Sequence, residues 1–229
     1  MRQGLVELLV VIGVIAILLG LLFGVLSVAR QRAVQTSCAR NLSNLAAAVQ
    51  LYANENRGWV PRDYGMDIVT REPGWQTQLG RLLRNGAEVD REKLWQYDFF
   101  RCAAHPEERA ATSYVLNAFA FETAPNWRPA GPTRLAIVQR PSQLPWIADC
   151  ADRFAPPDPD GLQIDTVFFG QYHDLWAPVH LETRLAKERH GTRLNMLYLD
   201  GHVASILRSE LRLEDFDDGI RQRVDRANW

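Results

Sequence analysis

The strongest constraint in this chain is an uncharged apolar run from Leu8 to Leu26, nineteen residues long. Only Glu7 interrupts the apolar sequence that begins at Leu5. As a helix, the segment 5–29 would extend about 37 Å at about 1.5 Å per residue, which is enough to cross a hydrocarbon core of about 30 Å. The run therefore predicts a single membrane-spanning helix within the segment 1–29. A membrane is thus an expected partner of the chain.

A cleaved secretory signal is the alternative interpretation of this segment. It would begin at Arg2 and end at a small-x-small site, Ser27-Val28-Ala29, before Arg30. The apolar core of a signal peptide is roughly 7–15 residues long, so the run is too long for one, and Glu7 is out of place in it. Arginines flank both ends of the run, so the positive-inside bias alone does not fix its orientation.

Glu7 is an unusual residue for this position, because a carboxylate in hydrocarbon costs free energy unless a cation or a hydrogen-bond donor meets it. Two partners remain open: Arg2 of the same chain, or the amino terminus of a neighbouring copy. Ala16, Gly20 and Gly24 follow at four-residue spacing, which lets apolar helices pack closely. These four positions are the candidate assembly residues.

The helical pattern continues beyond the apolar run and becomes amphipathic in the segment 30–57. Six apolar positions recur there every three or four residues: Val34, Cys38, Leu42, Leu45, Val49 and Tyr52. Asn56-Arg57-Gly58 and Pro61 then supply a stop signal. We expect one continuous helix from about Leu5 to Asn56, with one half in the membrane and the other half packed on a domain.

The segment 58–229 reads as one exterior α+β domain with an antiparallel sheet. A helix is predicted over Trp75–Asn85, short strands or bridging segments over Arg134–Gln139 and Leu144–Ala148, and a loop over Pro156–Gly161. The whole chain carries 26 Lys and Arg against 27 Asp and Glu. This near-neutral balance argues against a sequence-independent nucleic-acid binder, so no nucleic-acid partner is expected.

A hairpin is the clearest element near the end of the chain. Two apolar runs, Leu194–Leu199 and His202–Leu207, flank the dipeptide Asp200-Gly201. Asp-Gly favours a two-residue type I′ turn. Because both strands are apolar on both faces, we expect them in a buried part of the sheet.

Several motifs together resemble the type IV prepilin and type II secretion pseudopilin family. The resemblance lies in Gly4–Ile12, Cys38–Leu45 and Tyr52–Asn56, and in a histidine, nine residues and Asp-Gly, which span His190 to Gly201 within the hairpin region 190–207. It implies cleavage between Gly4 and Leu5 by a prepilin peptidase and N-methylation of Leu5. It also implies assembly with other pilin-like subunits through Glu7, from a single-pass position in the inner (cytoplasmic) membrane with the carboxy-terminal domain outside.

The leader departs from the family pattern in one respect. The family usually places an aromatic residue and a threonine between the glycine and the Leu-Val-Glu triplet, and here Glu7 is already third after Gly4. Two missing residues shift a helical carboxylate by about 3 Å along the axis and about 200° around it. Peptidase recognition and filament pairing both depend on this position, and a permanently anchored, unprocessed chain is the alternative.

No catalytic constellation is recognisable, and the chain is not expected to be an enzyme. His190 and Asp200 stand at opposite ends of the predicted strand, about 25–30 Å apart, so structural roles are expected for both. The other histidines of that region lack tight ligand spacing, so no metal site is assigned and no cofactor is expected. Calcium stays open on one set of acidic residues: Asp149, Asp152, Asp158, Asp160 and Asp165.

The chain has three cysteines, so at least one thiol is left over from any intramolecular disulfide. The resemblance implies cysteines at comparable places in related sequences, and it therefore favours a bridge between Cys38 and Cys102. Three reduced core cysteines are the alternative.

These expectations combine into a pseudopilin-like, non-enzymatic subunit of a type II secretion or type IV pilus-type machine. The alternative is a membrane-tethered surface module that binds glycans or other polymers through Trp and Tyr and does not polymerise. A secreted hydrolase released by signal cleavage is the third interpretation. Assembly requires leader removal and self-association, and a tether requires neither.

Overall fold

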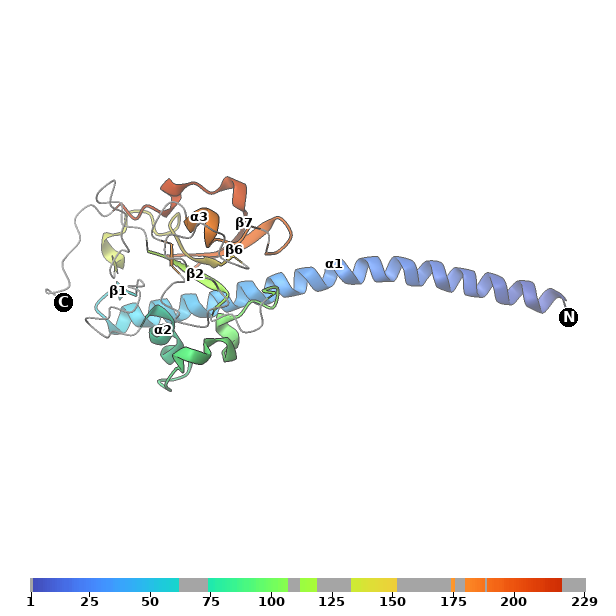
Figure 1. Cartoon of the computed structure of the whole chain (residues 1–229), viewed down its shortest axis with the longest axis horizontal. Helices are drawn as coiled ribbons and strands as arrows, with labels where there is room; N and C mark the ends of the chain where they lie inside the picture. The colour runs from blue at the N-terminus through green and yellow to red at the C-terminus, as the bar shows by residue number, and fades with distance from the viewer. Residues whose placement is uncertain are drawn as a thin grey trace.

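A computed structural model gives the architecture of the chain (Figure 1). It describes residues 2–61, 74–106, 112–118, 133–151, 174–175, 180–187 and 189–219. The predicted loop at Pro156–Gly161 lies outside these ranges. The described part is an α+β protein in which one long amino-terminal helix precedes antiparallel sheets, as the sequence predicts.

Helix α1 (Arg2–Glu55) is a single element of 54 residues, about 81 Å long at about 1.5 Å per residue. Its first half projects away from the rest of the molecule (Figure 1). The large apolar side chains between Leu8 and Val28 are all exposed there. By length and composition α1 is able to cross a membrane once.

The second half of α1 is embedded in the domain through the predicted apolar stripe. Cys38, Leu42, Leu45 and Val49 are buried, and Val34 and Tyr52 pack against the same core. The helical period brings these positions to one face of α1, and burial of that face stabilises the second half in water.

The predicted stop signal ends α1 where the sequence places it. Arg57 and Gly58 adopt positive φ angles of 55° and 84°, and the Gly58 amide donates to the carbonyl of Ala53 at 2.7 Å. The Asn56 side-chain amide donates to the Tyr52 carbonyl at 2.8 Å. The Gly58 bond satisfies a carbonyl that the last turn leaves without a helical partner, and the Asn56 side chain is a second donor to the Tyr52 carbonyl, which also accepts from the Asn56 amide at 2.9 Å.

The remaining described elements are short helices of three to nine residues and short strands of two to six residues. Along the chain they are β1 (Trp59–Val60), α2 (Trp75–Leu83), η1 (Arg91–Gln96), η2 (Asp98–Phe100), β2 (Tyr114–Asn117), β3 (Thr133–Arg134), η3 (Leu135–Ile137), β4 (Pro145–Asp149), β5 (Asp174–Leu175), α3 (His180–Thr183), β6 (Arg193–Tyr198), β7 (Val203–Leu207), η5 (Arg208–Glu210) and η6 (Leu213–Phe216). Helix α2 and strand β4 fall close to their predicted segments, whereas the segment predicted at Arg134–Gln139 is mostly the 3-10 helix η3.

Five of the strands form the main sheet in the order β5-β2-β4-β6-β7. The pairs β2–β4, β4–β6 and β6–β7 are antiparallel, and β5 pairs with β2 in parallel. Strands β1 and β3 form a separate antiparallel pair beside the end of α1.

The central strands of the main sheet are buried on both faces. One face packs on α1, and α2 and η2 contact α1 as well. The other face is covered by α3 and by apolar residues that follow β7, including Phe216. Along β2 the side chains alternate between these two cores: Tyr114 and Leu116 lie toward α1, and Val115 lies toward α3. This explains why the strand sequences are apolar without a polar face.

Two expectations for the hairpin are wrong. The turn runs from Tyr198 to Gly201, and the Gly201 amide donates to the Tyr198 carbonyl at 2.9 Å. Gly201 has a φ of 99°, and Asp200 is not among the described residues with positive φ. The connection is therefore a three-residue loop in which the glycine alone takes the left-handed conformation, a geometry that Asp-Gly fits as well as a type I′ turn.

The position of the second strand also differs from the expectation. Strand β6 is interior and largely buried, whereas β7 is the edge strand of the main sheet and is half-buried throughout. Val203 of β7 packs against the core on the α1 face, and Ile206 packs against the core on the opposite face, which includes Phe216.

Candidate functional site

The predicted assembly residues lie on the projecting half of α1. Glu7 and Ala16 are exposed, and a Cβ built on Gly4, Gly20 or Gly24 would have no described atom within 4 Å. The side chains of Arg2 and Leu5 lie outside the described part of the chain. The choice between Arg2 and a neighbouring copy as the partner of Glu7 stays a prediction, as does cleavage after Gly4.

A disulfide marks the point where α1 enters the domain. It joins Cys38 of α1 to Cys102, which follows η2, with 4.9 Å between the two Cα atoms. These are the two cysteines that the resemblance pairs. Cys150 is buried and outside the disulfide, and its thiol donates to the Thr112 carbonyl oxygen at 3.6 Å.

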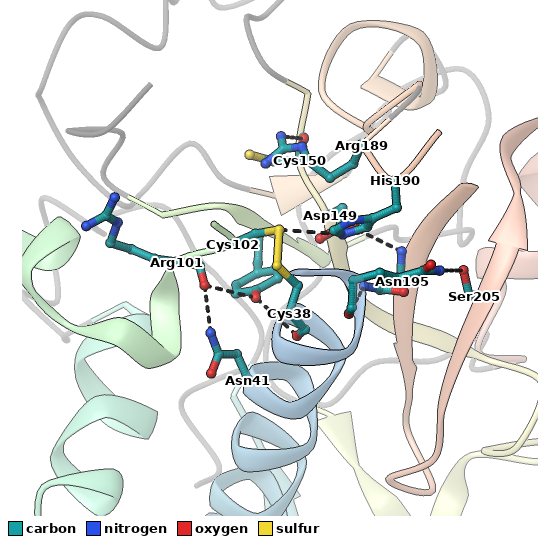
Figure 2. A network of polar contacts seen from close by, with 12 residues as sticks. Cys38, Asn41, Arg101, Cys102, Asp149, Cys150, Arg189, His190, Asn195 and Ser205 are labelled. Carbon is teal, nitrogen blue, oxygen red and sulfur yellow. Dashed lines mark hydrogen bonds and ion pairs between the residues drawn. A yellow bond between two sulfur atoms is a disulfide. The ribbon is translucent and has the colours of Figure 1, made fainter. Parts of the chain in front are cut away.

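His190 lies against this disulfide, and its side chain is buried. Its Nε2 atom is 3.5 Å from Cys102 Sγ and 3.4 Å from Asp149 Oδ2. The side chains of His190 and Asp149 are only 3% and 0% exposed. Figure 2 shows that the four side chains, Cys38 included, converge from separate segments of the chain.

Local backbone structure holds His190 and Asp149 in place. The His190 amide donates to the Arg193 carbonyl at 3.0 Å across a tight turn in which Gly191 has a φ of 72°. Asp149 is the last residue of β4, and its Oδ2 accepts a hydrogen bond from the Asn195 amide of β6 at 2.7 Å. Its other oxygen, Oδ1, is buried and has no hydrogen-bond partner among the described residues.

Tyr114 lies beneath the disulfide and connects two chain segments. Its hydroxyl is 3.3 Å from the Cys38 carbonyl and 3.4 Å from the Arg101 carbonyl. Asn41, one helical turn further along α1, donates to the Arg101 carbonyl at 2.7 Å. Burial, and secondarily the Asp149 carboxylate, raise the pKa of Tyr114 well above its ordinary value.

A second set of polar contacts joins α1 to the hairpin (Figure 2). The Asn195 side-chain amide of β6 donates to the Gln35 carbonyl at 3.2 Å. The Gln35 side chain donates to the Ser205 hydroxyl of β7 at 2.7 Å. With the disulfide, these bonds fix the direction in which α1 leaves the domain.

The motif residues His190 and Asp200 do not form one site. Strand β6 separates them, and Asp200 lies in the hairpin turn, where its Oδ1 accepts from the His202 amide at 3.1 Å and lies 2.6 Å from His202 Nδ1. The His190–Gly201 motif therefore contains one residue of the buried contacts around the disulfide, His190, and one residue of the hairpin turn, Asp200.

Asp149 is the network residue that sequence reasoning missed as a partner of His190. A signal was available, because it is a carboxylate at the end of the otherwise apolar segment Pro145–Cys150. The other acidic residues considered for calcium, Asp152, Asp158, Asp160 and Asp165, lie outside the described residues.

A groove of about 750 Å³ opens beside this network. Its walls combine the last apolar turns of the projecting helix with residues of the domain, among them Gln35, Ala103, Ala104, His190 and Gly191. The groove reaches His190 and Ala103, which directly follows Cys102.

No family model, no curated protein and no solved structure matches this chain. Two features of the described residues bear on function. One is the exposed apolar half of α1, and the other is the buried network at the base of that half.

Proposed function

We propose that this protein is a pilin-like, membrane-anchored subunit of a type II secretion or type IV pilus-type assembly, with a structural rather than an enzymatic role. One observation carries the proposal. A single helix, α1, is apolar and uncovered along its first half and supplies the core of the domain along its second half. An exposed apolar surface of this extent needs lipid or other subunits to cover it in water.

The contacts around the start of the embedded half support an assembly role. A helix that packs in a membrane or filament transmits the position of its domain only if the junction is rigid. Here three sets of contacts hold the junction: the disulfide, the Tyr114 contacts and the Gln35 contacts. We therefore expect the domain and the projecting helix to move as one rigid body.

The proposal includes a location and an orientation. The first half of α1 would cross the inner membrane once, with the domain on the outer side of that membrane. A disulfide is the stable form of a cysteine pair in an oxidising exterior compartment, which supports this orientation.

The proposed partners follow from the exposed first half. Gly4 and Leu5 would form the cleavage site of a prepilin peptidase, and methylation would follow on Leu5. Glu7 would pair with the amino terminus of a neighbouring subunit, and Ala16, Gly20 and Gly24 would let neighbouring helices approach.

Cysteine crosslinking in membranes tests the assembly role. Both cysteines of the disulfide are occupied and Cys150 is buried, so an introduced Ser27→Cys provides the exposed reactive thiol. We expect crosslinked dimers in membranes, and we expect Glu7→Ala in the same background to reduce their yield at least several-fold. Loss of the pairing carboxylate is the cause.

Glu55→Ala is the matched control, because Glu55 is an exposed carboxylate at the other end of the same helix. It should leave the crosslinking yield unchanged. A chain that stays in the membrane but forms no dimers, or dimers that Glu7→Ala does not affect, would reject the assembly role. The first of these results would favour the membrane-tethered binding module.

A further inference from the structure

The network beneath the junction contains an arrangement that the pilin-like role does not use. Two sulfurs and an imidazole nitrogen, Cys38 Sγ, Cys102 Sγ and His190 Nε2, lie within 4.8 Å of one another in a buried place, and Asp149 Oδ2 lies 3.4 Å from His190 Nε2. We propose that the reduced form of the cysteine pair, with His190 and Asp149, binds one thiophilic divalent cation, and that Zn²⁺ fits the site best. This inference does not depend on assembly into a filament.

The spacing of the ligand atoms supports a tetrahedral site. With Zn–S near 2.3 Å and Zn–N and Zn–O near 2.0–2.1 Å, tetrahedral angles place a sulfur and a nitrogen about 3.5 Å apart, and a nitrogen and an oxygen about 3.3 Å apart. His190 Nε2 lies 3.5 Å from Cys102 Sγ and 3.4 Å from Asp149 Oδ2. Two of the three pairs that include His190 thus already have the separations of ligands on a common ion, and the third, with Cys38 Sγ, lies within 4.8 Å.

The sulfur pair requires only a local adjustment. The three ligand atoms of Cys38, Cys102 and His190 lie within 4.8 Å of one another. Once the disulfide is reduced, the two sulfurs need to separate to about 3.8 Å to become tetrahedral neighbours. Side-chain rotation at a helix residue and at a loop residue supplies this movement, while the histidine stays anchored by its backbone hydrogen bond.

Asp149 places a buried carboxylate beside His190. Its side chain is completely buried, and its Oδ1 has no hydrogen-bond partner among the described residues. A buried carboxylate oxygen without a partner is costly, and native proteins usually satisfy such groups. A cation bound to Oδ2 beside His190 would balance the carboxylate charge, and the hydrogen bond from Asn195 to the same oxygen would orient the ligand.

The groove beside α1, whose walls also carry Arg30, Arg32 and Arg189, is the proposed path of an ion to the site. The groove is lined by His190 itself and by Ala103, which directly follows Cys102. The site is therefore buried but adjacent to an open volume of about 750 Å³.

Metal binding and the disulfide exclude each other, because both use the same two sulfur atoms. In the metal form the two thiols lose their protons to solvent and bind as thiolates. A thiol reductant, itself oxidised to a disulfide, converts the pair to two thiols, and in that state the site holds the cation. Where the pair is oxidised, the site is a disulfide with His190 beside it.

The test uses the full chain in detergent, with cobalt(II) as the spectroscopic probe. The protein is reduced with a phosphine, freed of reductant and titrated with Co²⁺. We expect the visible bands of tetrahedral Co²⁺ and a near-ultraviolet thiolate charge-transfer band, saturating at one ion per chain and displaced by Zn²⁺. The oxidised protein should give neither band.

Variants separate this site from adventitious binding. His190→Ala and Asp149→Asn should weaken Co²⁺ binding by about 10- to 100-fold or more, the range seen when supporting groups of metal sites are removed. His202→Ala, an exposed histidine, and Cys150→Ala, a buried thiol outside the cluster, should leave the affinity unchanged. Equal affinity in His190→Ala and the wild type would overturn the proposal.

A second measurement covers variants that fold poorly. It uses only the wild-type chain, whose melting temperature is recorded in the reduced state with and without Zn²⁺. Binding to the folded state alone must raise the melting temperature of the reduced chain and leave that of the oxidised chain unchanged. No rise in the reduced chain, or an equal rise in both, would contradict the proposal.

Discussion

At the scale of single residues, the junction between α1 and the domain is held by buried polar side chains from distant parts of the chain. Cys102 and His190 are 88 positions apart, and Asp149 and Asn195 are 46 apart. Sequence patterns report local periodicity and short motifs, and none of these pairings is local. The resemblance supplied the cysteine pair and pointed to His190, but only the fold brings His190 beside Asp149 rather than Asp200.

Tyr114 predicts a pH dependence of stability at this junction. Burial raises its pKa, so above pH 10 the unfolded chain loses the phenol proton while the folded chain keeps it. The unfolded state then binds fewer protons, and the free energy of unfolding falls by up to about 1.4 kcal/mol per pH unit from this group. Below pH 10 the contribution is constant.

Urea denaturation at a series of pH values from 8 to about 11 measures this slope. Tyr114→Phe should lower the free energy of unfolding by about 1 kcal/mol at pH 8, because the hydroxyl contacts are missing. Above pH 10 the free energy of unfolding of this variant should decline less steeply than that of the wild type. Tyr198→Phe is a comparison at a half-exposed tyrosine whose pKa burial also raises, to a smaller extent. An unchanged slope in Tyr114→Phe would contradict the assignment.

At the scale of elements, α1 was the most predictable part of the chain. Its length, its two halves and its stop at Asn56 follow from the apolar run, a helical stripe and a Gly-containing end, all of which are local signals. The hairpin was predicted in place but not in detail. Asp-Gly is compatible with more than one turn, and the position of β7 at the sheet edge depends on strand order, which the strand's own sequence does not contain.

The stripe on α1 predicts an uneven response to mutation along one helix. Leu45 is fully buried and Leu51 is 49% exposed. Leu45→Ala should destabilise the domain by about 2–5 kcal/mol, because it removes buried methyl groups and leaves a cavity. Leu51→Ala, the matched control, should change stability by about 0.5 kcal/mol or less.

Tryptophan fluorescence during denaturation provides the measurement, since Trp75 and Trp146 are fully buried in the same core as Leu45. Equal effects of the two substitutions would mean that the second half of α1 does not pack as described. An effect of Leu51→Ala alone would assign the opposite face of the helix to the core.

At the scale of the whole molecule, the disulfide ties α1 to a segment 64 residues away. Closing a loop of this length restricts the unfolded chain, and the chain-entropy estimate gives about 4 kcal/mol of stabilisation. Replacing Cys38 and Cys102 by serine together should therefore lower the free energy of unfolding by about that amount. Denaturant midpoints of the double variant and the oxidised wild type check this value, with Cys150→Ser as the single-thiol control. A loss no larger than that of the control would show that the disulfide is not important for stability.

The architecture as a whole combines a helix able to span a membrane with a domain built on its second half. The layout was predictable, because an apolar run followed by an amphipathic stripe without an intervening breaker leaves few alternatives. The pilin-like role of this layout is the central proposal. It requires that the leader ending at Gly4 is processed although two customary residues are missing before Glu7.

The mass of the amino terminus of the membrane-extracted protein, co-expressed with a prepilin peptidase, tests this proposal most directly. The pilin-like role predicts a chain that begins at N-methylated Leu5 and remains in the membrane. A chain that still begins at Met1 would contradict processing and indicate a permanent tether. A soluble chain that begins at Arg30 would contradict both the pilin-like role and the tether.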